Sequence, residues 1–111
     1  MKAKYLGMIS LAKRANKLKC GNYLVKNAID TGSAGIVVID KALSDKVSEG
    51  IKKMCRDRNV LCIETLNPDE LPEIAGRENV KTMCVTDKKM GNAIYKKYLE
   101  DSEKSPETAD E

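Results

Sequence analysis

Apolar residues near the start of the chain recur at the spacing of α-helices. Between residues 3 and 15 this spacing makes one face of a helix apolar, and the face holds Tyr5, Leu6, Met8, Ile9, Leu11 and Ala12. A second helix is predicted over residues 23–31, after a turn and a helix cap at Gly21 and Asn22 and before a stop at Gly32. Residues 16–19 connect the two helices and leave room for a short strand.

The middle and the end of the chain alternate between strands and helices. Residues 36–39 are an unbroken run of isoleucine and valine, which is typical of a strand covered on both faces. After this run the sequence predicts an amphipathic helix that begins at Ser44, a strand over 60–63, a short helix over 68–75, a strand over 80–85 and a helix that begins at Asp87. Alternating strands and helices predict an α/β fold in which helices cover both faces of one sheet, the three-layer α-β-α sandwich.

Charge is distributed unevenly along the 111 residues, a length that suits one domain with one core. Residues 1–29 include seven basic residues and no acidic residue, whereas residues 99–111 include six acidic residues against Lys104. The end of the chain therefore has a net charge of −5 and the part before it +8, which together give +3. We expect residues 1–100 to form a basic domain and residues 101–111 to form an acidic, disordered tail.

The sequence lacks residue types that several kinds of site require. There is no histidine, and the cysteines at 20, 55, 62 and 84 lack the paired spacing of a zinc site, so we expect reduced thiols and no metal. No nucleophile, general base or phosphate-binding loop is recognisable, which predicts a protein without catalytic activity or cofactor. Asp40 ends a predicted strand, where α/β enzymes often keep a functional carboxylate, although such a residue is more often a cap or a solvated loop residue. Since there is neither a secretory signal nor an apolar run of about 20 residues, we expect a cytoplasmic protein without membrane contacts.

Four stretches of sequence are specific in their order and separation when they are taken together. They are residues 11–18 followed by Gly21, residues 24–32 running into 36–40, Glu70 and Leu71 with Gly76, and residues 85–87 followed by Ala93 and Ile94. Through them residues 5–99 resemble the superfamily of kink-turn RNA-binding ribosomal proteins, the L7Ae and L30e family, and most closely its small bacterial YlxQ-like members. The resemblance implies a four-stranded mixed sheet between helices, and recognition of a sharply bent RNA helix that contains tandem sheared G·A pairs.

The resemblance also implies which residues contact RNA. In that family the start of the second helix enters the widened groove at the kink, and a hydrophobic loop before the last strand covers an extruded nucleotide. The matching positions are Gly21, Asn22, Tyr23, Leu24, Val25, Lys26 and Asn27 for the helix, and Glu70, Leu71 and Pro72 for the loop. The chain departs from the family at Tyr23 and Leu24, where the best RNA binders carry an Asn-Glu pair. It also departs at Asn27, since the expected lysine is displaced to position 26, and at Pro72, where glycine is usual.

The residue types at these positions favour the same surface without the family. A helix amino end offers free N–H donors and a partial positive charge, which suit phosphate oxygens. Asn22 and Asn27 can donate to and accept from base edges. Salt-sensitive attraction to the RNA backbone would come from Lys13, Arg14, Lys17, Lys19 and Lys26. Each feature also has an ordinary reading, with Asn22 as a helix cap, Leu24 as a core residue and the basic residues as a solvated face.

The sequence therefore predicts a non-catalytic protein of ribosomal type that binds kinked or otherwise folded RNA, ribosomal RNA among the candidates, and is a monomer in isolation. The alternative is a protein-interaction module that keeps the fold but has lost its RNA target, in which Tyr23 and Leu24 contact the partner. A third reading, an enzyme built on an α/β sandwich, lacks a recognisable catalytic set.

Overall fold

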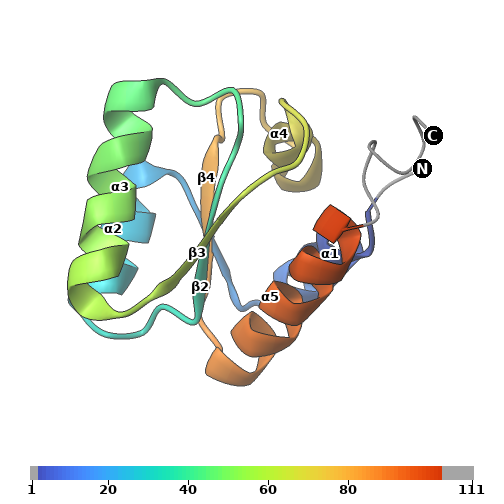
Figure 1. Ribbon diagram of the computed structural model, residues 1–111, viewed down its shortest axis with the longest axis horizontal. Helices are drawn as coiled ribbons and strands as arrows, with labels where there is room; N and C mark the ends of the chain where they lie inside the picture. The colour runs from blue at the N-terminus through green and yellow to red at the C-terminus, as the bar shows by residue number, and fades with distance from the viewer. Residues whose placement is uncertain (1–2, 104–111) are drawn as a thin grey trace.

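The helices and strands of the protein alternate in the predicted order in the computed structural model, which describes residues 3–103 (Figure 1). The elements are α1 (Lys4–Arg14), β1 (Leu18–Cys20), α2 (Asn22–Asp30), β2 (Ile36–Ile39), α3 (Asp45–Arg58), β3 (Leu61–Glu64), α4 (Glu70–Ala75), β4 (Thr82–Val85) and α5 (Lys88–Glu103). The short strand for which the connection between the first two helices left room is present as β1.

The end of α5 and the start of α4 differ from the prediction. Helix α5 continues to Glu103, so residues 101–103, predicted as the beginning of a disordered tail, are helical. The Asp101 carboxylate accepts a hydrogen bond of 2.9 Å from the backbone N–H of Tyr5, which joins this end of α5 to the first turn of α1. The rest of the predicted tail, residues 104–111, lies outside the described residues. Helix α4 begins at Glu70 rather than at Pro68.

The four strands form one mixed sheet in the order β1-β4-β2-β3. β4 runs antiparallel to both β1 and β2, while β2 and β3 are parallel, and Ile36 of β2 pairs with Val85 on one side and Leu61 on the other. The two central strands, β2 and β4, are buried at every position. A strand with both faces covered has no polar side, which is why β2 has an unbroken apolar sequence.

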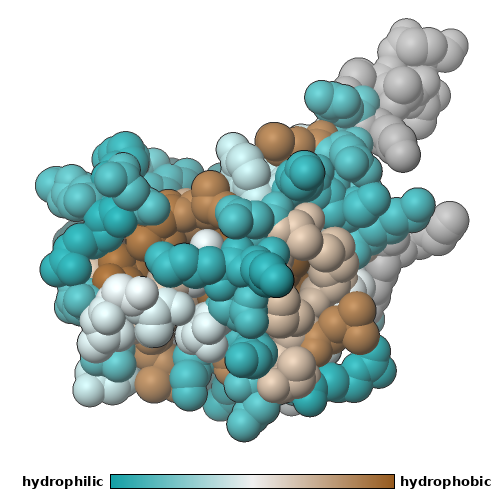
Figure 2. Space-filling view, turned by 90° about the horizontal axis from the view of Figure 1, so that it is seen from below, coloured by the Kyte–Doolittle hydropathy of each residue, from teal (hydrophilic) through white to brown (hydrophobic). Residues whose placement is uncertain are grey.

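Helices cover both faces of the sheet, so the predicted three-layer α-β-α sandwich is confirmed (Figure 1). The layer of α1, α4 and α5 packs on a core that includes Tyr5, Ile9, Val38, Met83 and Ile94. The layer of α2 and α3 packs on Val25, Ile29, Val37, Ile51 and Cys84. Seen from below, hydrophilic side chains cover most of the surface and apolar side chains gather toward its centre (Figure 2). Within residues 3–103, no helix is both long and apolar enough to span a bilayer.

The buried carboxylate of Asp40 organises the loops at one end of the sheet. This residue follows β2 and is fully buried. Its Oδ1 accepts hydrogen bonds from the N–H groups of Ala42 at 2.9 Å and Asp69 at 2.7 Å, and its Oδ2 accepts one from Leu71 at 2.9 Å. The carboxylate thus joins the loop between β2 and α3 to the start of α4. Of the two readings that the sequence left open, the structure supports a cap rather than a reactive group.

The four cysteines are free thiols, as predicted. Burial raises the pKa of the Cys84 thiol to about 11. A hydrogen bond between the thiols of Cys55 and Cys62 lowers the pKa of Cys55 and raises the pKa of Cys62. Cys84 therefore remains a protonated, weakly nucleophilic thiol near neutral pH.

We expect iodoacetamide to alkylate the half-buried Cys20 well before Cys84 when the folded protein is treated at mildly alkaline pH. Only the thiolate reacts readily, and burial suppresses both the thiolate form and the access of reagent at Cys84. Peptide mass mapping of samples quenched at successive times measures the two rates. Unfolding in guanidinium should remove the difference, whereas equal rates in the folded protein would contradict the burial of Cys84.

Candidate nucleic-acid interface

A polar groove of about 490 Å³ lies at the end of the sheet where β1 leads into α2. Three segments that are far apart in the sequence line it, namely residues 20–22, residues 42–44 before α3, and the loop between α4 and β4. The lining residues are Cys20, Gly21, Asn22, Ala42, Leu43, Ser44, Arg77, Asn79, Val80 and Lys81. Among these described residues two carry a positive charge and none carries a negative charge. We call this site the α2 groove.

The first turn of α2 is anchored to β4 at the edge of this groove. Gly21 precedes the helix with a φ of 99°, a conformation that favours glycine, and its N–H donates a hydrogen bond of 2.9 Å to the carbonyl of Thr82. Asn22 is the first helical residue rather than the predicted cap, and its Oδ1 accepts a hydrogen bond of 2.8 Å from the Thr82 hydroxyl. No described side chain caps the helix, so its amino end is open to an anion.

Most of the residues predicted on α2 are exposed together next to the groove. The side chain of Tyr23 is 80% exposed and that of Leu24 is 42% exposed. Tyr23, Lys26 and Asn27 are spaced so that they share the outward face of the helix. Val25 is the exception, because it is fully buried in the core beneath α2.

Lys19 belongs to the same surface, and the preceding basic residues Lys13 and Lys17 contact other elements. Lys19 is exposed on β1, and it pairs across the strands with Cys84, which places it on the face of the sheet that α2 covers. The ammonium of Lys13 donates a hydrogen bond of 2.9 Å to the Ile74 carbonyl in α4, and Arg14 is exposed in the same turn of α1. Lys17 lies at the opposite end of β1 from Gly21, about 13 Å along the strand, and its Nζ is 3.8 Å from Oδ2 of Asp87.

Glu70, Leu71 and Pro72, which were predicted as an RNA-binding loop, do not form a loop. These residues form the first turn of α4. Leu71 is fully buried in the core, and its N–H is bound to Asp40, so its side chain is out of reach of a ligand. The carboxylate of Glu70 accepts a hydrogen bond of 3.4 Å from the Tyr5 hydroxyl.

The loop that precedes the last strand is instead residues 76–81, between α4 and β4, and its residues Arg77 and Asn79 were not among the predicted site residues. Gly76 ends α4 with a φ of 74°, after which Arg77 and Asn79 are exposed and line the α2 groove. A glycine followed by polar residues before an apolar strand was the available signal. Ser44 was also missed, because it was read only as a helix cap. It holds that position, but its hydroxyl makes no capping bond and lines the groove.

The sequence matches the model of the ribosomal protein L7Ae/L30e/S12e/Gadd45 family over residues 3–97. Proteins of that family generally bind RNA and are not enzymes. The chain matches none of the curated proteins with which it was compared. In fold it is similar to a solved structure described as a protein with unknown function from Bacillus halodurans C, with a TM-score of 0.80 and 20% sequence identity over 86% of this chain and 97% of that chain.

Proposed function

Because the chain belongs to the ribosomal protein L7Ae/L30e/S12e/Gadd45 family, we propose that it is a non-catalytic protein that binds folded RNA through the α2 groove. The observation that carries this proposal is the junction of an uncapped helix amino end with the cationic loop 76–81 in one groove. The finer parts of the proposal are a kinked RNA as the ligand, a ribosomal type of protein close to the YlxQ-like branch, and a cytoplasmic location.

The α2 groove and the start of α2 suit the phosphate groups of RNA. The open N–H groups at the start of α2 and its helix dipole attract an anion. Lys19 on β1 and Lys26 on α2 are exposed, and Arg77 and Lys81 line the α2 groove. Lys81 also lies 3.1 Å from a carboxylate oxygen of Asp69, so Arg77 is the stronger phosphate ligand of the two.

Tyr23 and Leu24 suit an unpaired nucleotide better than the edges of paired bases. Both are exposed at the helix end that would enter the RNA, and neither offers the paired donors and acceptors that base edges require. An aromatic ring binds an extruded base by stacking, irrespective of sequence. Asn22, Asn27 and Asn79 remain the exposed amides that contact base or sugar groups. The RNA that fits is therefore folded, with at least one base outside the helical stack.

Reversing the charge of Lys26 or Arg77 is expected to weaken RNA binding by about tenfold in each variant, because each change removes a phosphate contact and adds a repulsion. Fluorescence anisotropy with a labelled kink-turn hairpin, measured between about 50 and 200 mM salt, tests this expectation. The slope of log affinity against log salt should also become shallower, by roughly 0.9 for each phosphate contact that is lost.

Lys96→Glu is the matched control, because Lys96 is exposed on α5, on the other face of the sheet, and the change in net charge is the same. This variant should bind like the wild type. A hairpin of the same length whose duplex has no kink should bind more weakly than the kinked one. If Lys26→Glu and Arg77→Glu bind normally, or if the control loses as much, the α2 groove is not the RNA site. If the wild type binds no folded RNA even at low salt, the function itself is rejected.

A further inference from the structure

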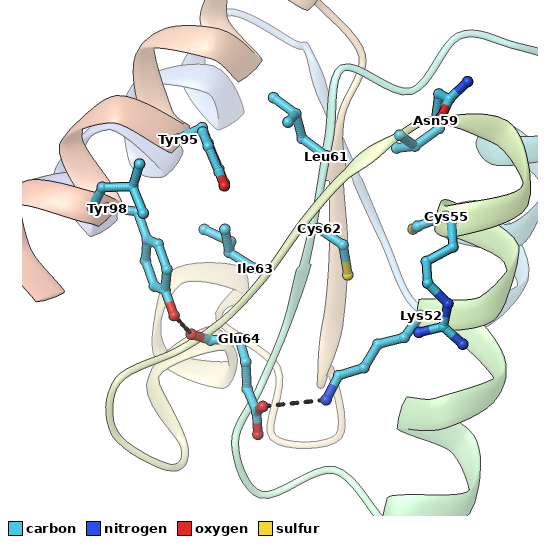
Figure 3. A pocket seen from close by; sticks show the side chains of 12 residues that line it. Lys52, Cys55, Asn59, Leu61, Cys62, Ile63, Glu64, Tyr95 and Tyr98 are labelled. Carbon is cyan, nitrogen blue, oxygen red and sulfur yellow. Dashed lines mark hydrogen bonds and ion pairs between the residues drawn. The ribbon is translucent and has the colours of Figure 1, made fainter.

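A second and larger groove, of about 750 Å³, follows the opposite edge of the sheet (Figure 3). Its floor is the edge strand β3, which among residues 3–103 is paired only with β2. One wall is α3 and the other is α5, and side chains from both helices point toward the strand (Figure 3). We call this site the β3 groove. The α2 groove adjoins β1, at the other edge, so the two sites are separate.

The floor of the β3 groove presents main-chain hydrogen-bonding groups. The N–H of Thr65, which follows β3, donates to the Ile39 carbonyl of β2. Because successive residues of a strand point their N–H and C=O groups to opposite sides, those of Cys62 and Glu64 face away from β2 and into the groove. The Tyr98 hydroxyl donates a hydrogen bond of 2.7 Å to the Glu64 carbonyl, which agrees with this direction. The natural complement of such an edge is another extended polypeptide.

The two walls differ in chemistry. The α5 wall consists of Tyr95, Tyr98 and Leu99, and the Leu99 side chain is 44% exposed. The α3 wall has Lys52 and Arg56. The α3 wall already binds one carboxylate of the chain itself, since Lys52 Nζ lies 3.5 Å from Oε1 of Glu64. Side chains of a strand alternate between the two faces of a sheet, so a strand added here would direct every second side chain to the apolar wall and the others to the cationic wall.

We propose that the β3 groove binds an extended segment of a partner protein in which apolar and acidic side chains alternate, by adding it to the sheet as a fifth strand. A second copy of this chain fits less well, because its own β3 lies between the same two helices. Pairing two such strands at about 4.8 Å would force the helices of both copies into each other. The chain's own sequence after Glu103 is acidic but has no large apolar side chain for the α5 wall.

The direct test uses a fluorescein-labelled peptide of about six residues, an ordinary strand length, in which valine alternates with glutamate. We expect the full-length protein to increase its anisotropy in a saturable manner. A peptide of the same composition with all valines before all glutamates, and one with lysine in place of glutamate, should each bind at least about tenfold more weakly. Methylating the backbone nitrogens along one edge of the peptide should abolish binding, whereas methylating the other edge should not, because only one edge faces β3.

Variants of the walls locate the site. Arg56→Glu and Leu99→Asp should each weaken peptide binding by about tenfold. Lys53→Glu is the matched control, because Lys53 is exposed on the same helix but does not line the groove, and it should bind the peptide normally. Circular dichroism and RNA binding should be unchanged in all three variants, so that a failure here is distinguishable from a failure of the proposed RNA site.

Four results would overturn the proposal. The first is no binding of the alternating peptide, and the second is equal binding of the block peptide. The third concerns the full-length variant with Glu107→Gln, Asp110→Asn and Glu111→Gln, in which the acidic residues after Glu103 are neutralised. If this variant binds the peptide more tightly than the wild type, the chain's own end is the occupant of the groove. The fourth is a concentration-dependent dimer, in analytical ultracentrifugation, that the peptide dissociates, since a second copy would then occupy the groove.

Discussion

Replacing Asp40 by alanine is expected to lower the free energy of unfolding by about 4 kcal/mol, a large part of the stability of a small domain. The carboxylate is fully buried and accepts three backbone hydrogen bonds, from Ala42, Asp69 and Leu71. Alanine leaves these N–H groups without their acceptor, and each unsatisfied buried donor costs about 1–3 kcal/mol. Because Ala42 also lines the α2 groove, RNA affinity should fall as well at temperatures where the variant is still folded.

Urea unfolding followed by far-UV circular dichroism measures the effect of the Asp40 substitution. Asp45→Ala is the control, since Asp45 is exposed in the first turn of α3 and its loss should cost less than about 1 kcal/mol. Asp40→Asn should fall between the two, because the amide keeps one acceptor oxygen and turns a donor toward the remaining N–H. If Asp40→Ala is no less stable than Asp45→Ala, the carboxylate does not hold the loops together.

Gly91→Ala is expected to destabilise the protein by about 3 kcal/mol, although the same change within a helix normally stabilises it. A Cβ atom at Gly91 would lie 2.7 Å from the carbonyl carbon of Gly35 and 2.8 Å from its oxygen. Both contacts are with backbone just before β2, so no side chain can rotate away. Gly35→Ala should be at least as harmful, since its Cβ would lie 2.7 Å from the carbonyl carbon of Asp87 and 2.9 Å from the carbonyl oxygen of Val85.

Gly50→Ala provides a control of opposite sign. Gly50 lies in α3, is exposed, and an added Cβ there would meet nothing within 4 Å. This substitution should stabilise the protein by about 0.5–1 kcal/mol, because alanine is the better helix former. Thermal unfolding of the two variants in parallel should shift the midpoints in opposite directions. A higher midpoint for Gly91→Ala would show that α5 does not pack backbone to backbone against the start of β2.

The core elements of the fold were predictable because the spacing of apolar residues within each one indicates which of its positions are buried. The run from Ile36 to Ile39 has no polar position, and the structure buries all of it between two layers of helices. Likewise Ile51 and Cys55 are separated by one helical turn and lie on the buried face of α3. Such patterns depend only on neighbours within one element, so they can be read without knowing what covers them.

The proposed RNA-binding surface was only partly predictable, because it combines segments that are distant in the sequence. Tyr23 and Lys26 were assigned to it from the sequence because they follow the turn that begins α2. Arg77 and Asn79 were not, since nothing close to them in the sequence indicates that β4 lies next to β1 and brings the loop before it to the start of α2. The loop was instead assigned to Leu71, whose apolar character reflects a place in the core.

By itself, the sequence determined the five helices and three of the four strands in their order, the basic opening segment and the resemblance to an RNA-binding family. Only the tertiary structure decided the strand order, the structural role of Asp40, the composition of the α2 groove and the open edge of β3. The physical reason is that periodicity and local charge are properties of a single segment. A groove or a buried carboxylate depends on which distant segments meet, and that choice is made by the packing of the whole chain.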